Sequence, residues 1–386
     1  MADALRVAIA TESFLPTVNG VTTSVLRVLD HLAERGHEAM VIAPSAGAPP
    51  GYAGFPVFEV AALPYRRFPV GLPSLAIAAL LDSFSPDVLH AAAPFALGAS
   101  AIAAASRLGI PSVAVYQTDV AGYARRNGLA AASPLAWRLV RAIHERADLT
   151  LAPSSAAITD LEWAGVPRLA RWGRGVDAER YHPRNRALPA TRALRARLAA
   201  PDEVLVGYVG RLAPEKQVER LAALRGLAGV RIAIVGDGPG APAARRALTG
   251  MPVSWLGELH GQELATAYAA LDVFVHTGSE ETFGQTLQEA GATGLPVVAP
   301  RAGGPIDIVE EGVTGILVDP DSRTAWRRAV RALVTDAGLR ARMGEAARRR
   351  MLGRGWDSIG EELVHHYLSA ASSRRPSAEL SRRRAI

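Results

Sequence analysis

Short apolar segments alternate with amphipathic segments along almost the whole chain, and this alternation restricts the possible folds more than any other feature. Residues 5–10 are predicted to form a strand, and residues 21–35 a helix with one apolar face that stops at Gly36. Strands that are separated by helices run parallel, so the pattern predicts βαβ units in doubly wound α/β sheets. Further strands are predicted at residues 38–43, 88–90, 112–116, 149–152, 204–209, 230–235, 253–256, 273–276 and 296–299.

The alternation loosens between residues 168 and 202 and then restarts, which predicts two domains. A chain of 386 residues is also too long for one ordinary hydrophobic core. Two Rossmann-like units in tandem are the simplest interpretation. We expect an N-terminal domain at residues 1–185, a C-terminal domain at 200–355, a helix at 356–370 that packs back on the N-terminal domain, and a disordered basic tail at 371–386.

Composition excludes several classes of protein. Hydrophobic residues make up 49 % of the chain and charged residues 21 %, as in soluble globular proteins. The most apolar stretches fall far short of the roughly 20 residues that a spanning helix needs, and no leader-like segment opens the chain. The absence of cysteine excludes a disulfide framework and agrees with a cytoplasmic location. The net charge of +6 comes without a basic stripe interleaved with aromatic residues, so nucleic-acid binding is not expected.

Lys216 is the only lysine in the chain; every other basic residue among the 43 is an arginine. Codon bias would explain the count, but the position is informative, because Lys216 and Arg211 follow the predicted strand at 204–209. Ligands of doubly wound sheets bind at the carboxyl ends of strands. Two cations there suit a diphosphate, the guanidinium as a fork and the ammonium as a point charge. The alternative is an ordinary loop with a salt bridge to Glu215.

Two glutamates, Glu281 and Glu289, flank seven residues at the junction of a predicted strand and a helix. If the helix begins near Thr282 or Phe283, its free N–H groups form an anion site, with Glu281 in front of it and Glu289 about two turns further in. A carboxylate accepts hydrogen bonds from vicinal hydroxyls of a ribose or a sugar. The spacing therefore provides one carboxylate for each end of a nucleotide sugar. The alternative is a capping glutamate and a surface glutamate, but the apolar residues 290–298 argue against a solvated Glu289.

These motifs resemble those of the retaining glycosyltransferases of family 4. Residues 281–289 and 294–299 are similar to the E-x7-E signature of that family, and the resemblance extends over roughly residues 5–365. Within the family the chain most resembles actinobacterial α-mannosyltransferases that use GDP-mannose, on residues 116–119, 172–177 and 276–278. Other segments that resemble family blocks are residues 210–216, 235–239, 303–304 and 312–318.

The resemblance implies a GT-B fold, in which two Rossmann-like doubly wound domains face each other across a cleft. The implied activity is retaining transfer of a hexose, mannose from GDP-mannose, to a hydroxyl of a lipid-linked or glycoside acceptor. The donor phosphate then takes the proton of the acceptor, and no covalent sugar enzyme forms. Alternatives are a nucleotide-sugar epimerase, a phosphorylase, or a catalytically silent nucleotide-sugar-binding protein. We expect no metal or other cofactor, because no Asp-x-Asp motif lies between a strand and a helix in the way that divalent-metal sugar transferases use it, and Arg211 with Lys216 already supplies the charge of a magnesium ion.

The resemblance also implies roles for individual residues. Arg211 and Lys216 would neutralise the donor diphosphate, and Glu281 would contact the donor sugar. Glu289 would hold the ribose. The flexible glycine of the Asn19–Gly20 pair would let the N-terminal domain approach the donor closely. The expected donor-binding residues are Asn19, Gly20, Gly210, Gly236, Phe283, Gly284, Gln285, Thr286 and Glu289. The expected catalytic residues are Arg211, Lys216 and Glu281, which the resemblance implies, and Asp119, which it does not.

The chain departs from the family in the loop after the predicted strand at 112–116. Many relatives carry a histidine there near the donor sugar, whereas this loop holds Gln117 and Asp119. We favour Asp119, because a carboxylate would also stabilise positive charge that develops on the sugar. The alternative is an aspartate that only caps a turn.

A membrane-borne acceptor is a further expectation. Basic and aromatic residues near the apolar segment 74–84 suit an anionic headgroup surface, to which the protein would attach peripherally. The alternative is that this segment is the core face of a helix with solvated arginines beside it. The residues that carry the expectation are Arg66, Arg67, Tyr123, Arg125 and Arg126.

Overall fold

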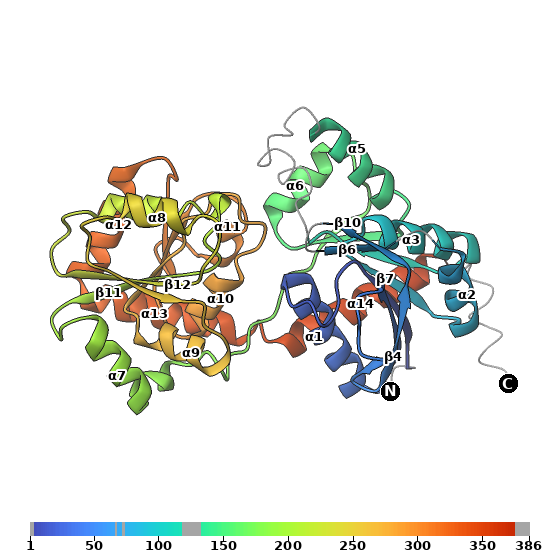
Figure 1. The fold of residues 1–386 in the computed structure, drawn as a ribbon, viewed down its shortest axis with the longest axis horizontal. Helices are drawn as coiled ribbons and strands as arrows, with labels where there is room; N and C mark the ends of the chain where they lie inside the picture. The colour runs from blue at the N-terminus through green and yellow to red at the C-terminus, as the bar shows by residue number, and fades with distance from the viewer. Residues whose placement is uncertain (1–3, 66–67, 72–73, 118–132, 375–386) are drawn as a thin grey trace. The chain divides into compact units, whose positions relative to one another are not determined.

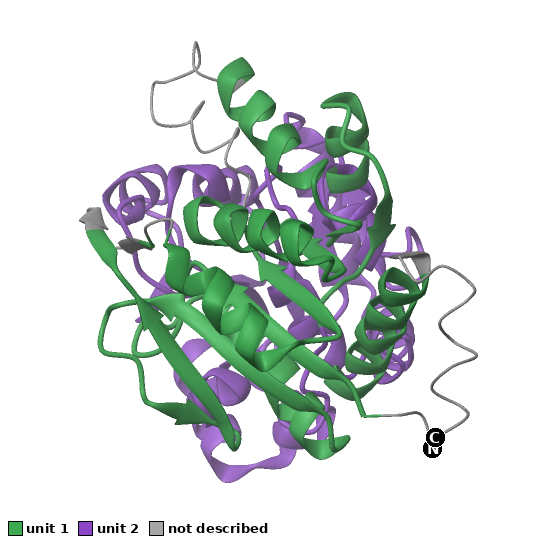
Figure 2. Cartoon of the chain, turned by 90° about the vertical axis from the view of Figure 1, so that its right-hand side faces the viewer, with its two compact units in different colours: residues 1–153, 157–174, 356–386 green, residues 154–156, 175–355 purple. Residues whose placement is uncertain are grey.

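The computed structural model describes residues 4–65, 68–71, 74–117 and 133–374, which form two compact units (Figure 2). The boundary follows Arg174 rather than residue 185, because Val176 and Tyr181 are buried in the core of the second unit. The first unit holds the described residues of Met1–Pro153, Ala157–Arg174 and Trp356–Ile386, and the second holds Ser154–Ala156 and Gly175–Gly355.

The first unit is built on an eight-stranded sheet in the order β10-β9-β8-β7-β1-β2-β4-β3. Every neighbouring pair is parallel except β3 and β4. Buried side chains occupy both faces of the central strands, as is usual for parallel sheets covered by helices. The strands are β1 (Arg6–Thr11), β2 (Glu38–Pro44), β3 (Gly51–Tyr52), β4 (Phe55–Val60), β7 (Val88–Ala92), β8 (Ser112–Val115), β9 (Leu149–Ala152) and β10 (Leu169–Arg171), and a separate antiparallel pair consists of β5 (Ala62–Tyr65) and β6 (Phe68–Gly71).

Helices α1 (Gly20–Glu34) and α14 (Trp356–Arg374) pack on one face of this sheet. The other face is covered by α2 (Leu75–Phe84) and α3 (Ala96–Leu108). Two hydrogen bonds anchor α14 in the first unit: Trp172 Nε1 donates to the Ile359 carbonyl at 2.9 Å, and the Tyr367 hydroxyl lies 2.6 Å from His90 Nδ1. Because α14 continues to Arg374, the first four residues of the expected tail are helical; residues 375–386 lie outside the described residues. The unit also contains α5 (Ser133–His144) and α6 (Ser155–Trp163).

The second unit has a six-stranded parallel sheet in the order β13-β12-β11-β14-β15-β16. Numbered within the unit, this is the 3-2-1-4-5-6 order of dinucleotide-binding sheets. Strands β12 and β13 are added on one side of β11 and strands β14 to β16 on the other, so the strand order reverses between β11 and β14. The two parallel sheets confirm the predicted α/β fold class. The strands are β11 (Val204–Val209), β12 (Val230–Val235), β13 (Val253–Gly257), β14 (Val273–Val275), β15 (Val297–Pro300) and β16 (Gly315–Val318).

Alternate residues of the strands supply two hydrophobic clusters, one on each face of this sheet. Leu205 and Val209 of β11 join the cluster under α9 (Gly261–Ala270) and α10 (Gln285–Ala292). Val206 and Tyr208 join the cluster under α8 (Ala241–Ala247) and α12 (Arg323–Thr335). Figure 1 shows α9 and α12 on opposite sides of the sheet. The remaining elements are α7 (Pro189–Leu198), α11 (Pro305–Ile308), α13 (Ala337–Leu352) and the 3-10 turns η2 (Pro183–Ala187), η3 (Pro214–Lys216) and η4 (Val218–Leu224).

Candidate functional site

The candidate site lies at the point of the second sheet where the strand order reverses, between β11 and β14. Strands β11 and β14 are neighbours, so the loops that follow their carboxyl ends leave the same edge of the sheet side by side. A hydrogen bond of 2.6 Å from Thr277 Oγ1 to the Lys216 carbonyl ties the two loops together. The residues singled out on the two strand ends therefore meet in space.

Lys216 and Glu281 form an ion pair at this point. Lys216 Nζ lies 2.6 Å from Glu281 Oε2, and the two side chains are only 24 % and 15 % exposed. Burial is the largest single influence and raises the pKa of Glu281, but the charge and hydrogen bond of Lys216, with His276 and the Phe283 N–H, together outweigh it and lower the pKa to about 2. Glu281 is therefore a fixed anion at neutral pH, and its position is set by a cation on the neighbouring loop.

His276 also belongs to the site. In the sequence it is notable only because residues 276–278 resemble those of relatives. Its side chain is 3 % exposed, and Nε2 lies 3.7 Å from Glu281 Oε2. Burial lowers the pKa of His276 to about 4, so the imidazole is neutral at physiological pH. Neither ring nitrogen makes a hydrogen bond of 3.5 Å or less among the described residues, although the backbone of Gly278 lies close enough to oppose the lowering of the pKa in part. The apolar strand before His276 gave no signal that the ring turns toward Glu281.

Glu289 lies in an environment unlike that of Glu281. The Tyr268 hydroxyl donates to Glu289 Oε2 at 2.8 Å, and the Tyr181 hydroxyl bonds to the same carboxyl group. Burial raises the pKa of Glu289 to about 7, because no cation contacts it and the two hydroxyls compensate only in part. Two glutamates from one motif thus have pKa values on opposite sides of the ordinary range, which is typical of functional sites.

The helix that carries Glu289 begins later than predicted. Helix α10 begins at Gln285, not at Thr282 or Phe283, because Gly284 has a φ of 105° that no helical residue can adopt. Glu289 is consequently about one turn inside the helix rather than two. Phe283 and Gly284 stay in the preceding loop, while the backbone N–H groups of Gln285 and the next residue, Thr286, belong to the first turn, where they lack partners within the helix.

Arg211 has the carboxylate partner that the alternative interpretation proposed. Its Nη2 lies 2.7 Å from Glu215 Oε1, and the Arg211 side chain is 64 % exposed. The salt bridge does not bury the guanidinium, which remains accessible at the strand end. Both cations of the motif therefore stand at the same edge of the sheet, each beside one glutamate.

Glycines permit the close packing of the loops at this edge. Gly236 has a φ of 125°, and a Cβ atom added to it would lie 2.0 Å from the Gly210 carbonyl oxygen. A Cβ on Gly304 would lie 2.2 Å from the Phe283 carbonyl oxygen, and the Gly304 N–H donates to the Glu281 carbonyl at 2.7 Å. These glycines bring four loops together without side chains between them.

The corresponding edge of the first unit contains Asn19 and Gly20. Asn19 Oδ1 caps helix α1 by accepting from the N–H groups of Val21 and Thr22, so the side chain has a structural task. A Cβ on Gly20 would lie 2.9 Å from Arg174 Nη1, the end of a flexible side chain that can move aside.

The loop after β8 is described only up to Gln117, whose Oε1 is buried and has no hydrogen-bond partner among the residues that the structure describes. Six residues named in the sequence analysis lie outside the described residues: Arg66, Arg67, Asp119, Tyr123, Arg125 and Arg126.

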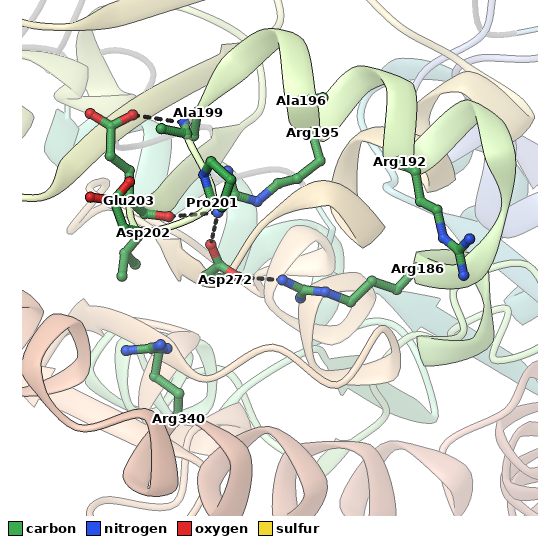
Figure 3. Close-up of a pocket in the computed structure, with 12 residues that line it drawn as sticks. Arg186, Arg192, Arg195, Ala196, Ala199, Pro201, Asp202, Glu203, Asp272 and Arg340 are labelled. Carbon is green, nitrogen blue, oxygen red and sulfur yellow. Dashed lines mark hydrogen bonds and ion pairs between the residues drawn. The ribbon is translucent and has the colours of Figure 1, made fainter.

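A cavity of about 500 Å³ lies at the opposite edge of the sheet of the second unit (Figure 3). It is lined by residues of α7, by the segments that lead into β11 and β14, and by Arg340 of α13. Asp272 within it pairs with Arg186 and with Arg195. These ion pairs occupy the amino ends of β11 and β14, away from Lys216 and Glu281. Within residues 4–65, 68–71, 74–117 and 133–374, no group of three or more His, Asp or Glu side chains is placed to hold a metal ion, and no helix is long and apolar enough to cross a membrane.

Comparison with known proteins shows the family of the chain. The model of Glycosyltransferase Family 4 matches residues 18–180, and that of Glycosyl transferases group 1 matches residues 191–350. The chain is 47 % identical to the GDP-mannose-dependent alpha-mannosyltransferase of Mycolicibacterium smegmatis, over 94 % of this chain and 97 % of that protein. It is 45 % identical to the enzyme of the same name from Mycobacterium tuberculosis, over 97 % and 99 %.

Solved structures share the fold. HepE from Anabaena, solved in complex with UDP, superimposes with a TM-score of 0.76 at 20 % identity, over 95 % of this chain and 100 % of that one. Sucrose-phosphate synthase from Thermosynechococcus elongatus gives 0.77 at 21 % identity, over 96 % and 100 %. At 47 % identity over 94 % of its own length and 97 % of that relative, the chain belongs to glycosyltransferase family 4, in the group that contains the actinobacterial alpha-mannosyltransferases.

Proposed function

We propose that this glycosyltransferase moves mannose from GDP-mannose to a hydroxyl of an acceptor, with retention at the anomeric carbon. The observation that carries the proposal is the contact between Lys216 and Glu281, on the loops after β11 and β14, where the strand order of the second sheet reverses. It places a cation for the diphosphate beside an anion for the sugar hydroxyls. The names of the 47 % and 45 % identical relatives support mannose and guanine as the sugar and base.

The two cations act on the donor diphosphate. As the bond between the anomeric carbon and the phosphate oxygen breaks, negative charge grows on the leaving GDP. Lys216 and Arg211 offset that charge, the former as a point charge in a largely buried position and the latter as a two-pronged donor. Glu281, ionised and immobilised by Lys216, accepts hydrogen bonds from hydroxyls of the mannose. Glu289 accepts hydrogen bonds from the ribose.

Retention proceeds on one face of the sugar in this proposal. The acceptor oxygen forms its bond to the anomeric carbon on the face that GDP leaves, and the acceptor proton passes to the departing phosphate oxygen. Glu281 is not the nucleophile, because an acid held by Lys216 in an ion pair is a poor attacking group. Mass spectrometry of the protein quenched during turnover tests this step: unmodified protein is expected, and a mannosylated Glu281 or Asp119 would overturn it.

We assign the donor to the second unit and the acceptor to the first. The acceptor is a membrane lipid or glycoside, and the protein attaches peripherally to the cytoplasmic face of the membrane. Helix α2 supports this in part: Ile77 and Leu81 form its core face, but Leu75 at its start is 89 % exposed. Vesicle co-sedimentation with the Arg66→Glu, Arg67→Glu double variant tests the attachment: binding to anionic but not neutral vesicles, weakened in the variant, is expected. No binding at low salt would exclude it.

Release of GDP from GDP-mannose, with and without an extract of membrane lipids, tests the function itself. Transfer predicts release that depends on the extract. Release of equal rate without any acceptor would favour an epimerase or a hydrolytic activity, and tight binding without release would favour a silent binding protein.

A further inference from the structure

Glu289 is held by hydroxyl groups alone. Its Oε2 accepts from the Tyr268 hydroxyl at 2.8 Å, and the Tyr181 hydroxyl bonds to the same carboxyl group. The nearest cation that influences it, Arg180, acts only through its field and makes no ion pair with it. Glu281 in the same motif is held by an ammonium instead, so the two acids are built for different partners.

The two tyrosines are themselves fixed by packing. Tyr268 in α9 is fully buried, and Tyr181 is 6 % exposed. Their rings meet edge to face with centroids 5.4 Å apart, and Tyr268 also packs against Phe274 of β14. Neither hydroxyl can turn away without moving a ring in the core, so both define where the carboxylate of Glu289 stands.

The hydrogen-bonding capacity of the carboxylate matches this arrangement. A carboxylate offers about four lone-pair sites. Two are taken by the tyrosine hydroxyls, which leaves two for donors from outside the core. A ribose presents two such donors, the vicinal 2′ and 3′ hydroxyls, in a fixed geometry. A 2′-deoxyribose presents one and would leave a half-buried acceptor unpaired, which is unfavourable.

We propose that Tyr268 and Tyr181 are positioning residues that aim Glu289 at the ribose diol, and that this arrangement makes the protein discriminate ribonucleotide from 2′-deoxyribonucleotide donors. The inference rests on the proposed function, since it takes Glu289 as the ribose contact. It adds two residues and a specificity that follow from the contacts of this chain.

Calorimetric titration of the full chain with GDP and with 2′-deoxy-GDP tests the inference. The parent is expected to bind GDP at least about tenfold more tightly, the factor of one hydrogen bond to a charged group. In Tyr268→Phe the affinity for GDP should fall by about the same factor, and that for 2′-deoxy-GDP, which keeps only its 3′ hydroxyl on Glu289, should fall by less, so the ratio approaches one. Tyr181→Phe should shift the ratio in the same direction. It also serves as the second variant if Tyr268→Phe fails to fold, which thermal unfolding would reveal.

Tyr367→Phe is the matched control. It removes an equally buried tyrosine hydroxyl, hydrogen-bonded to His90 in the first unit, and should leave the ratio of affinities unchanged. Equal weakening of both nucleotides in Tyr268→Phe, or an unchanged ratio, would overturn the inference. If the parent binds neither nucleotide, the proposed function fails instead, and the two failures are distinguishable.

Discussion

Replacing Lys216 by methionine removes the ammonium from Glu281 while keeping a side chain of similar length. The structure sets the magnitude. Lys216, with help from His276 and the Phe283 N–H, lowers the pKa of Glu281 from 4.5 to about 2 against the opposing effect of burial. Each pKa unit corresponds to about 1.4 kcal/mol, so these interactions stabilise the folded state by up to roughly 3 kcal/mol. Without the ammonium, burial raises the pKa of Glu281, and the unpaired carboxylate destabilises the folded state.

The sign of the pH dependence follows from the lowered pKa. A carboxyl group whose pKa is lower in the folded state contributes its full stability above 4.5, and the contribution disappears as the pH falls toward 2. Urea unfolding at pH 7 should therefore show a loss of roughly 3 kcal/mol in Lys216→Met, and the difference from the parent should shrink below about pH 4. Turnover of GDP-mannose should fall by roughly 100- to 1,000-fold, as for the loss of one preorganised donor to developing charge.

Two further variants distinguish loss of the Lys216–Glu281 ion pair from a general loss of stability. In the double variant Lys216→Met, Glu281→Gln, no unpaired carboxylate remains, so stability should recover in part while turnover does not. Arg349→Met breaks an ion pair with Glu345 whose side chains are 63 % and 73 % exposed, and should change stability by less than about 0.5 kcal/mol. An unfolding free energy equal to that of the parent, with turnover within a few-fold, would refute the reasoning.

Three other outcomes are expected. Because burial raises the pKa of Glu289 to about 7, GDP affinity should rise between pH 6 and 8 as the carboxylate of the folded protein ionises; a flat calorimetric profile would contradict this. The stability that the neutral form of Glu289 provides is fully present below pH 4.5 and should be lost as the pH rises from 4.5 to about 7. Gly236→Ala should lower the unfolding free energy by about 2 kcal/mol or more in urea, since its Cβ would lie 2.0 Å from the Gly210 carbonyl oxygen; an unchanged midpoint would count against the packing. Arg211→Ala should reduce turnover about 100-fold yet leave stability within about 0.5 kcal/mol, because its pair with Glu215 is exposed; equal losses in both would show a structural role.

Much of the fold could be predicted because parallel sheets leave a clear pattern. Strands such as β2 and β11 are buried on both faces and read as apolar runs, and the helices between them read as amphipathic segments. The carboxyl ends of β11 and β14 could be identified from the same pattern. Since neighbouring parallel strands end at one edge, the meeting of Lys216 and Glu281 followed from topology once the strand order was known.

Other features depend on packing that no local pattern records. Tyr268 is 21 residues from Glu289 and reaches it because α9 and α10 contribute to the same hydrophobic cluster. The start of α10 depends on the backbone conformation of Gly284, and the domain boundary depends on where Tyr181 is buried. The side chain of Asn19 is similarly committed to capping a helix, which its position in a motif did not reveal.

The proton spectrum of the mannosylated product most directly tests retaining transfer from GDP-mannose by the site around Lys216 and Glu281. The purified protein would be incubated with GDP-mannose and membrane lipids, and the one-bond carbon–hydrogen coupling of the new anomeric centre would be measured. Retention from the α-linked donor predicts GDP release that depends on the acceptor and a product linked only in the α configuration. A β-linked product, or no mannosylated product while GDP-mannose is bound or hydrolysed, would contradict it.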